Sequence, residues 1–276
     1  MGLVGVSTYL TSLTPRSWKS TPEAVREALA RYSTWSAEAG VDLAEHVALV
    51  DYGDVFDPDG DSGTRRVADH FGALDASLDL VLVLGGDNAA TYHAFRGLTG
   101  ADASALGLVT LDAHHDLREG ASNGSPVRQL LDAGLPGGQV AQAGIADFAN
   151  SAHYAGAARD AGITVFTREE ARRRGVEEVA AAALDVAGSG GRGVYVDVDL
   201  DVADRAAVPA CPAAVPGGLS ADELRRAVRR VARDPRVRAV DFTEVDVGRD
   251  SEDQRTVRLV ALCVLEVLVG VATRAA

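Results

Sequence analysis

Short runs rich in β-branched residues alternate along the whole chain with longer Ala-, Arg- and Glu-rich stretches of helical periodicity. Strands that alternate with helices are joined by right-handed crossovers, and the resulting parallel sheet is covered by helices on both faces. The sequence therefore predicts an α/β fold with an eight-stranded parallel sheet. The strands are expected at residues 3–7, 47–52, 78–84, 106–111, 139–144, 163–166, 193–199 and 237–245.

The segments between these strands predict the helices and the number of domains. Two helix starts can be read directly, because Thr21-Pro22-Glu23 offers a cap followed by proline and residues 220–223 (Ser-Ala-Asp-Glu) match a capping box. Residues 57–63, rich in Asp and Gly, are expected to form a loop. The Gly-rich stretch 188–191 is too short for a domain linker, so we expect one domain spanning residues 1–276. The helices are expected near residues 22–38, 64–76, 89–98, 126–133, 151–161, 168–187, 220–233 and 254–274.

Charge and composition argue against several kinds of partner. The chain has 27 Lys and Arg residues against 40 Asp and Glu residues, and the net charge of -13 disfavours binding to nucleic acid or to an anionic membrane surface. The longest apolar run, residues 259–272, contains Glu266 and is too short to span a bilayer. The two cysteines, Cys211 and Cys263, lie too far apart for a zinc motif or a disulfide framework. We therefore expect a cytoplasmic protein without a nucleic-acid or membrane partner.

Polar side chains follow four of the predicted strands, at the point where each strand ends. In open parallel sheets, ligands bind beyond the carboxyl ends of the strands, so these side chains are candidates for one shared site. The four clusters are Gly85-Gly86-Asp87-Asn88, Asp112-Ala113-His114-His115-Asp116, the acidic run from Asp197 to Asp204, and Glu244-Val245-Asp246.

Carboxylates that converge in this way would repel one another strongly, because like charges at short range cannot all ionise. A pair of divalent cations removes this conflict, and oxygen-rich ligation with one or two imidazoles suits Mn²⁺ better than Zn²⁺. The alternate spacing in Asp112-x-His114-x-Asp116 places three donors on one side of an extended segment, and Asp199-x-Asp201 repeats it. A single Asp after a strand is usually a cap or a turn residue, but the combination of motifs favours a metal centre. If the segment is extended, His115 points away from His114, and it is expected to be structural or to support the metal ligands.

These motifs resemble those of the ureohydrolases, the family of arginase, agmatinase and formimidoylglutamase. The family signatures are Gly-Gly-Asp-His, Asp-Ala-His-x-Asp, Asp-x-Asp-x-x-Asp and a late Glu-Val-Asn/Asp. They correspond here to residues 85–88, 112–116, 199–204 and 244–246. Asp197-x-Asp199 also fits part of the third signature, but only the frame from Asp199 places a third Asp correctly. The resemblance covers nearly the whole chain and implies a three-layer αβα arginase-like fold.

The resemblance also implies a metal-dependent amidine hydrolase with two Mn²⁺ ions and a hydroxide between them as nucleophile. It implies a catalytic role for Asp116, which would accept a hydrogen bond from the hydroxide, and for Glu244, which would pair with the cationic nitrogens of the substrate. Asn88 stands where the family has His, and its amide oxygen is a weaker ligand, so the first ion is expected to bind weakly. By the family pattern the first ion takes Asn88, Asp112, Asp116 and Asp199, and the second takes Asp112, His114, Asp199 and Asp201.

The loops after these signatures resemble those of formimidoylglutamases. Arginase-like members carry His-Gly-x-Pro, whose His shuttles protons, where this chain has Asn123-Gly124-Ser125-Pro126. Arg118 also fits the formimidoylglutamase branch and would clamp a carboxylate of N-formimidoyl-L-glutamate. Alternatively, Arg118 pairs with Glu119 or with a ligand Asp. Asn123 is a candidate substrate-binding residue, and Asn150 and Ser151 would contact the amino-acid end of the substrate or cap the next helix.

We therefore expect hydrolysis of N-formimidoyl-L-glutamate to L-glutamate and formamide, a step of histidine catabolism. Two alternatives stay open. One is an agmatinase or another guanidino-compound hydrolase that releases urea. The other, motivated by Asn88, is a metal-poor, catalytically impaired homologue that acts as a binding or assembly protein. The resemblance also implies a homo-oligomer, a trimer or hexamer.

Overall fold

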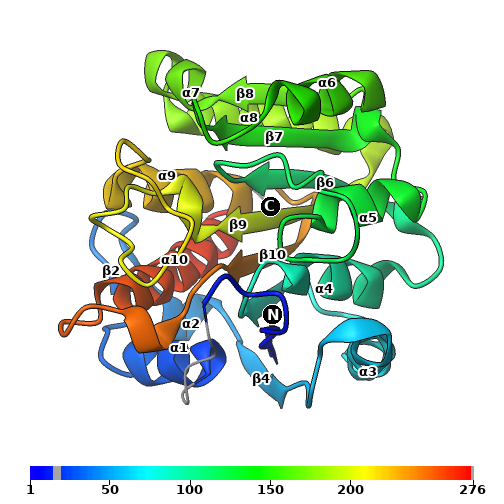
Figure 1. Cartoon of the computed structure of the whole chain (residues 1–276). Coiled ribbons are helices and arrows are strands. Elements are labelled where there is room, and N and C mark those ends of the chain that lie inside the picture. The colour runs from blue at the N-terminus through cyan, green and yellow to red at the C-terminus, as the bar shows by residue number, and fades with distance from the viewer. Residues whose placement is uncertain (15–19, 275–276) are drawn as a thin grey trace.

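The computed structural model describes residues 1–14 and 20–274. Within these residues, eight parallel strands form one sheet in the order β4-β1-β5-β10-β9-β6-β7-β8 (Figure 1). Every expected strand is present, with ends that differ from the prediction by a few residues. The strands are β1 (Gly2–Val6), β4 (Val50–Asp54), β5 (Val81–Gly85), β6 (Leu106–Leu111), β7 (Val140–Ile145), β8 (Thr164–Thr167), β9 (Gly193–Asp199) and β10 (Val237–Thr243). A separate antiparallel pair joins β2 (Trp35–Ser36) to β3 (Val41–Asp42).

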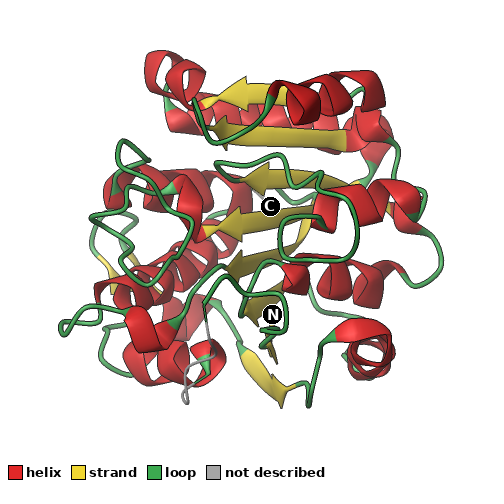
Figure 2. Ribbon diagram, viewed as in Figure 1, coloured by secondary structure: helices red, strands yellow, loops and turns green. Residues whose placement is uncertain are grey.

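Helices cover both faces of the sheet (Figure 2), because successive side chains of each strand point to opposite sides. Leu82 and Leu84 of β5 pack into a core with α1, α8, α9 and α10, whereas Val81 and Val83 pack with α3, α4, α5 and α6. The predicted three-layer αβα architecture is therefore confirmed. The helices are α1 (Thr21–Leu29), α2 (Leu43–His46), α3 (Gly60–Gly72), α4 (Ala89–Thr99), α5 (Pro126–Asp132), α6 (Ala152–Ala161), α7 (Arg168–Arg174), α8 (Val176–Ala187), α9 (Ala221–Ala232) and α10 (Arg255–Ala272).

Several helix boundaries differ from the prediction for local reasons. The helix expected over 22–38 ends at Leu29, and the Ser33 and Ser36 side chains then accept backbone hydrogen bonds that favour turns. The helix expected over 168–187 is divided at Gly175, whose φ of 94° a helix cannot continue. The loop expected over 57–63 already becomes helical at Gly60. The predicted capping box at residues 220–223 is present.

The topology brings together the strands that carry the polar clusters. In the sheet order, β5, β10, β9 and β6 are direct neighbours, although β5 and β10 are far apart in the chain. Their carboxyl ends therefore meet at the centre of one edge. Among the described residues, none of the helices has the length and apolar character of a membrane span. The expectation of a single domain over residues 1–276 stays a prediction.

Candidate metal centre and active site

Carboxylates and one imidazole from the ends of β6 and β9 meet in two small groups. One group is Asp112, His114 and Asp201, and the other is Asp112, Asp116 and Asp199. Within each group, one candidate ligand atom per residue lies within 4.8 Å of the others. Asp112 belongs to both groups, so the arrangement has the form of two adjacent cation positions that share one carboxylate.

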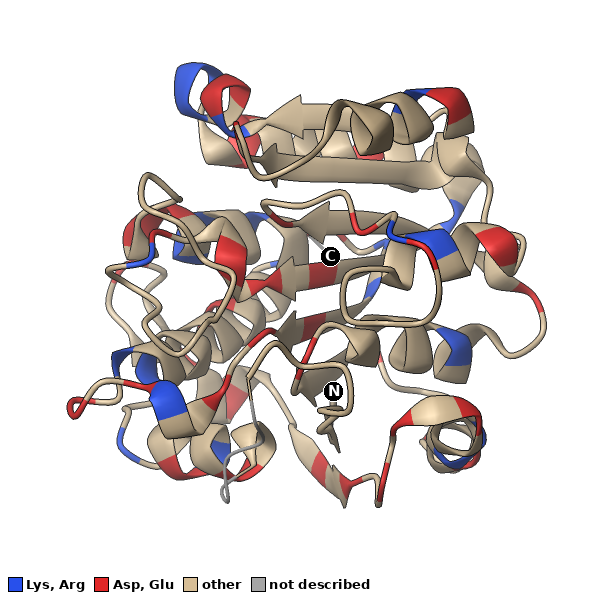
Figure 3. Cartoon of the chain, viewed as in Figure 1, with Lys and Arg blue, Asp and Glu red and all other residues tan. Residues whose placement is uncertain are grey.

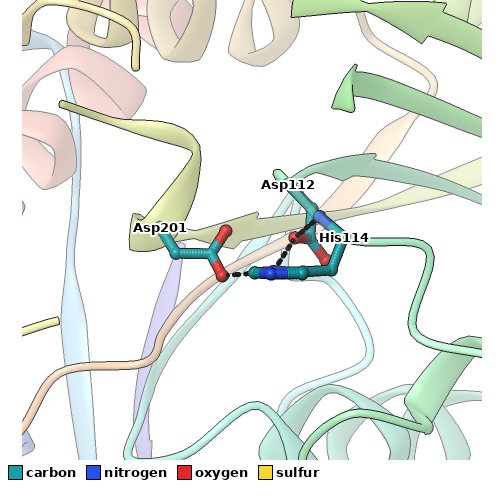
Figure 4. Close-up of side chains that lie close together, drawn as sticks. All are labelled: Asp112, His114 and Asp201. Atoms are coloured by element: carbon teal, nitrogen blue, oxygen red, sulfur yellow. Dashed lines mark hydrogen bonds and ion pairs between the residues drawn. The ribbon is translucent and has the colours of Figure 1, made fainter. Parts of the chain in front are cut away.

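His114 joins the two loops that supply these side chains. Its Nδ1 lies 2.6 Å from Oδ2 of Asp201 and 3.7 Å from Oδ1 of Asp112 (Figure 4). The backbone supports the same arrangement, because the amide of His114 donates to Oδ1 of Asp112 over 2.6 Å and the amide of Ala113 donates to Oδ1 of Asp201 over 3.0 Å. The loop after β6 is therefore fixed directly to the end of β9.

The site concentrates negative charge in a buried place (Figure 3 shows the acidic segments on β9, on β10 and in the loops after them). Asp112, Asp199 and Asp201 are at most 2% exposed. Burial and repulsion from Asp201 raise the pKa of Asp112 to about 7, and burial also raises the pKa of Glu244 to about 7. Burial opposes a charge on His114, yet hydrogen bonds to Asp112 and Asp201 raise its pKa to about 11. In the folded chain, the ionised forms of these carboxyls are therefore unfavourable unless a positive charge lies beside them.

The residues present fit a pair of divalent cations. Oδ2 of Asp112 is buried and has no hydrogen-bond partner among the described residues, although an unpaired buried carboxylate oxygen is costly. Carboxylate oxygens with a single imidazole form a donor set that suits Mn²⁺. The orphaned oxygen lies on the residue that both groups share.

Asn88, a predicted ligand of the first ion, holds Asp116 by a hydrogen bond. Its Nδ2 donates to Oδ2 of Asp116 over 2.6 Å, while its Oδ1 accepts from the hydroxyls of Thr91 at 2.8 Å and Thr243 at 3.0 Å. The amide oxygen, the only atom of this group that can bind a metal, therefore faces the two threonines. The role of Asn88 as a metal ligand stays a prediction.

Glu244 leaves β10 in an unusual backbone conformation. The predicted strand to residue 245 ends at Thr243 because Glu244 has a φ of 60°, in the left-handed region. Asp116 shares this feature, with a φ of 52°. Oε1 of Glu244 accepts from the amide of Asn88 at 2.9 Å and from Nδ2 of Asn123 at 3.0 Å, which leaves Oε2 for another partner. Non-glycine residues held in this region are concentrated at functional sites.

A pocket of about 340 Å³ opens over these residues. Arg118 is exposed at this pocket and forms no ion pair with another described residue, so the predicted alternative of pairing with Glu119 or a ligand Asp is not what the structure shows. Its aliphatic part packs over Gly124, where a Cβ would lie 2.8 Å from Cδ of Arg118. The pocket is lined by Leu13, His114, His115, Asp116, Leu117, Arg118, Asn123, Gly124, Ala149, Asn150, Ser151, Tyr154, Asp199, Asp201, Ala213 and Glu244.

Asn150 and Ser151 reach the pocket, but both have structural partners. The Asn150 amide accepts from the backbone of His115 at 3.0 Å and donates to the carbonyl oxygen of Ala113 at 2.9 Å, so it clamps the loop after β6. Ser151 caps α6 by accepting from the amide of Tyr154. The capping alternative for Ser151 is therefore confirmed, and substrate contacts from both residues stay predictions.

The structure separates the two possible frames of the β9 motif. Asp199 and Asp201 lie in the candidate ligand groups, whereas Asp197 is fully buried beside Asp241 and belongs to neither group. Asp204, the third Asp of the frame, accepts backbone hydrogen bonds from its own loop. His115, predicted to be structural or to support the metal ligands, is buried with Nδ1 2.7 Å from Oε1 of Gln142, and it is also among the residues that line the pocket. A signal for His115 existed in the sequence, namely the polar Gln142 inside an otherwise apolar strand.

Comparison with known proteins agrees with this geometry. The model of the arginase family matches residues 1–270. The chain belongs to the arginase family. The predicted recognition, an enzyme of this amidine-hydrolysing family, is thereby confirmed.

Individual relatives of this arginase-family chain cover almost all of it. It is 32% identical to a formimidoylglutamase of Halalkalibacterium halodurans, over 98% of this chain and 86% of the relative. The crystal structure of formimidoylglutamase from Bacillus subtilis superposes with a TM-score of 0.91 at 30% identity, covering 100% of this chain and 88% of that one. A formiminoglutamase of Trypanosoma cruzi, solved with Mn²⁺, has the same fold, with a TM-score of 0.88 at 24% identity over 99% of this chain and 94% of that one.

Proposed function

We propose that this arginase-family chain is a Mn²⁺-dependent formimidoylglutamase, which hydrolyses N-formimidoyl-L-glutamate to L-glutamate and formamide. The main observation behind the proposal is that acidic residues and an arginine line the same pocket. Acidic residues at its base, Glu244 among them, suit a cationic amidine, and Arg118 at the same pocket suits a carboxylate. The relatives named above support the same substrate.

Arg118 decides between amidine substrates. N-formimidoyl-L-glutamate carries two carboxylates, and a guanidinium without an intramolecular ion pair can bind one of them with two parallel hydrogen bonds. Agmatine has no carboxylate, and Arg118 would repel its positive charge. The pocket therefore favours an amidine of an acidic amino acid over a simple guanidino cation.

Asp116 and Glu244 would act on the substrate directly. Oε2 of Glu244, which has no hydrogen-bond partner among the described residues, pairs with the terminal amidine nitrogen and orients the carbon for attack. Asn88 occupies Oδ2 of Asp116, so Oδ1 of Asp116 can accept the proton released by the attacking water and pass it to the leaving nitrogen. The C–N bond then breaks, and the glutamate nitrogen leaves as an amine.

The chemistry of water activation comes from the cations. Asp112, Asp116, Asp199, Asp201 and His114 would hold two Mn²⁺ ions, which supply a strongly nucleophilic water at neutral pH. Homo-oligomerisation and a cytoplasmic location belong to the same proposal.

Arg118→Met tests the substrate assignment. Loss of the guanidinium should raise the KM for N-formimidoyl-L-glutamate by about 10- to 100-fold with a smaller change in kcat, because it removes a charge-assisted contact far from the reacting bond. Arg118→Lys should recover part of the loss. Formamide release is the measurement. Wild-type turnover of agmatine or another guanidino compound, with none of formimidoylglutamate, would reject the proposal.

A metal-poor, impaired homologue is the second candidate, and the orientation of Asn88 favours it. Asn88→His places an imidazole beside Asp116 in place of an amide whose oxygen faces Thr91 and Thr243. We expect Mn²⁺ content per chain, measured by elemental analysis at limiting Mn²⁺, to rise in this variant. Unchanged occupancy would show that Asn88 does not adjoin a cation. Wild-type protein that retains no Mn²⁺ at all would favour the impaired homologue.

A further inference from the structure

His115 is one of the residues that line the pocket together with the candidate metal ligands and Arg118. The residue is 4% exposed. Its backbone amide donates to Oδ1 of Asn150 over 3.0 Å, and the same Asn150 also holds Ala113. The backbone of His115 is thus fixed by the loops after β6 and β7.

Gln142 determines which ring nitrogen of His115 carries the proton. Nε2 of Gln142 donates to the carbonyl oxygen of His115 over 3.0 Å, and a carbonyl oxygen only accepts. The amide must therefore turn its Oε1 towards the ring, where Nδ1 of His115 lies 2.7 Å away and has to donate. In a neutral imidazole the other nitrogen, Nε2, is then an acceptor. Gln142 is fully buried on β7, so water does not compete for these bonds.

Nε2 of His115 has no hydrogen-bond partner among the described residues. It is also not among the fully buried polar atoms that lack a partner, so it is not completely enclosed. Because it is not fully enclosed and its residue lines the pocket, we take this nitrogen as an acceptor available to a ligand there. A ligand can use it only by offering an N–H or O–H group.

We propose that Nε2 of His115 accepts a hydrogen bond from the substrate nitrogen that leaves with the glutamate part. This inference rests on the proposed function and makes His115 a specificity-determining residue. The carboxylates of N-formimidoyl-L-glutamate only accept hydrogen bonds, so its donors are confined to the two amidine nitrogens. Glu244 is placed for the terminal nitrogen, which leaves the other for His115. The product L-glutamate carries its amino group at the same nitrogen.

Binding of two dicarboxylates to the Mn²⁺-loaded full chain tests this role. L-glutamate and glutarate share both carboxylates, but glutarate lacks the amino group. By calorimetry, wild-type protein should prefer L-glutamate by at least about tenfold. His115→Phe keeps a ring and removes the acceptor, so the preference should fall about tenfold, and His115→Gln, which retains an acceptor, should restore part of it. An undiminished preference in His115→Phe would overturn the inference.

The tautomer provides a second readout, which does not depend on turnover. Long-range ¹⁵N NMR of the full chain loaded with diamagnetic Mg²⁺ should show a protonated Nδ1 and an unprotonated Nε2 for His115. Gln142→Leu should give a mixture of tautomers and a reduced preference for L-glutamate, with secondary structure unchanged by circular dichroism. A protonated Nε2 in the wild type would overturn the inference while the enzyme still hydrolyses formimidoylglutamate. Absence of that hydrolysis would instead reject the proposed function.

Discussion

Asp112→Asn is expected to abolish Mn²⁺ binding and hydrolysis together. Asp112 belongs to both candidate ligand groups, and its Oδ2 is buried without a partner. Since even outer partners of metal ligands are worth about 10- to 100-fold, loss of a shared ligand should lower kcat/KM by at least about a thousandfold. Elemental analysis and formamide release are the measurements. Asp69→Asn, an exposed position on α3, is the matched control and should change neither.

The same variant should have the opposite effect on stability when a chelator is present. The fold raises the pKa of Asp112 from 3.8 to about 7, so between these values the folded chain binds more protons than the unfolded chain. The contribution of Asp112 to stability therefore falls as pH rises from about 4 to 7. With EDTA at pH 8, the Tm of Asp112→Asn should exceed that of the wild type, and added Mn²⁺ should raise only the wild-type Tm strongly. Equal responses of the two proteins to Mn²⁺ would contradict the assignment.

Glu244→Gln should produce a loss of comparable size with Mn²⁺ retained. The amide oxygen of Gln can still accept from Asn88 and Asn123, so the substitution removes mainly the negative charge opposite the amidine. We expect kcat/KM to fall by about a thousandfold, because a buried charge–charge contact to the substrate is lost. Mn²⁺ content should stay at the wild-type value, since Glu244 lies outside both ligand groups.

Glu252→Gln is the control for that experiment, because Glu252 is exposed in the loop before α10. It should retain wild-type activity. A Glu244→Gln enzyme within about threefold of wild type would show that this carboxylate does not orient the substrate, and the mechanism proposed above would then need another partner for the amidine.

The fold was readable from the sequence because buried parallel strands leave a strong local pattern. Runs such as residues 81–84 are apolar on both faces, and the alternation with helices predicted parallel pairing. The ends of helices were harder to predict from the sequence where a single residue determines them. Gly175 interrupts a stretch with continuous helical periodicity, and Gly60 begins a helix inside a segment of loop-like composition.

The candidate ligands were also predictable from the sequence. They follow predicted strands, and a parallel sheet brings the carboxyl ends of its strands to the same edge, where ligands bind. The sequence did not predict the backbone conformations and side-chain directions at the site. The left-handed backbone of Asp116 and Glu244 depends on surrounding loops, and the direction of the Asn88 amide depends on Thr91 and Thr243 from separate elements. The position of the His115 ring depends on Gln142 of β7. This polar residue stands out in an otherwise apolar strand, but the sequence does not show which residue it contacts.

Carboxylates at the ends of β6 and β9 would together hold two cations. Crystals of the full chain grown with Mn²⁺, with anomalous scattering recorded on both sides of the manganese edge, test it most directly. We expect two manganese peaks about 3.5–4 Å apart, one beside Asp116 and Asp199 and the other beside His114 and Asp201, with Asp112 between them. Crystals that show no manganese among these residues would contradict it.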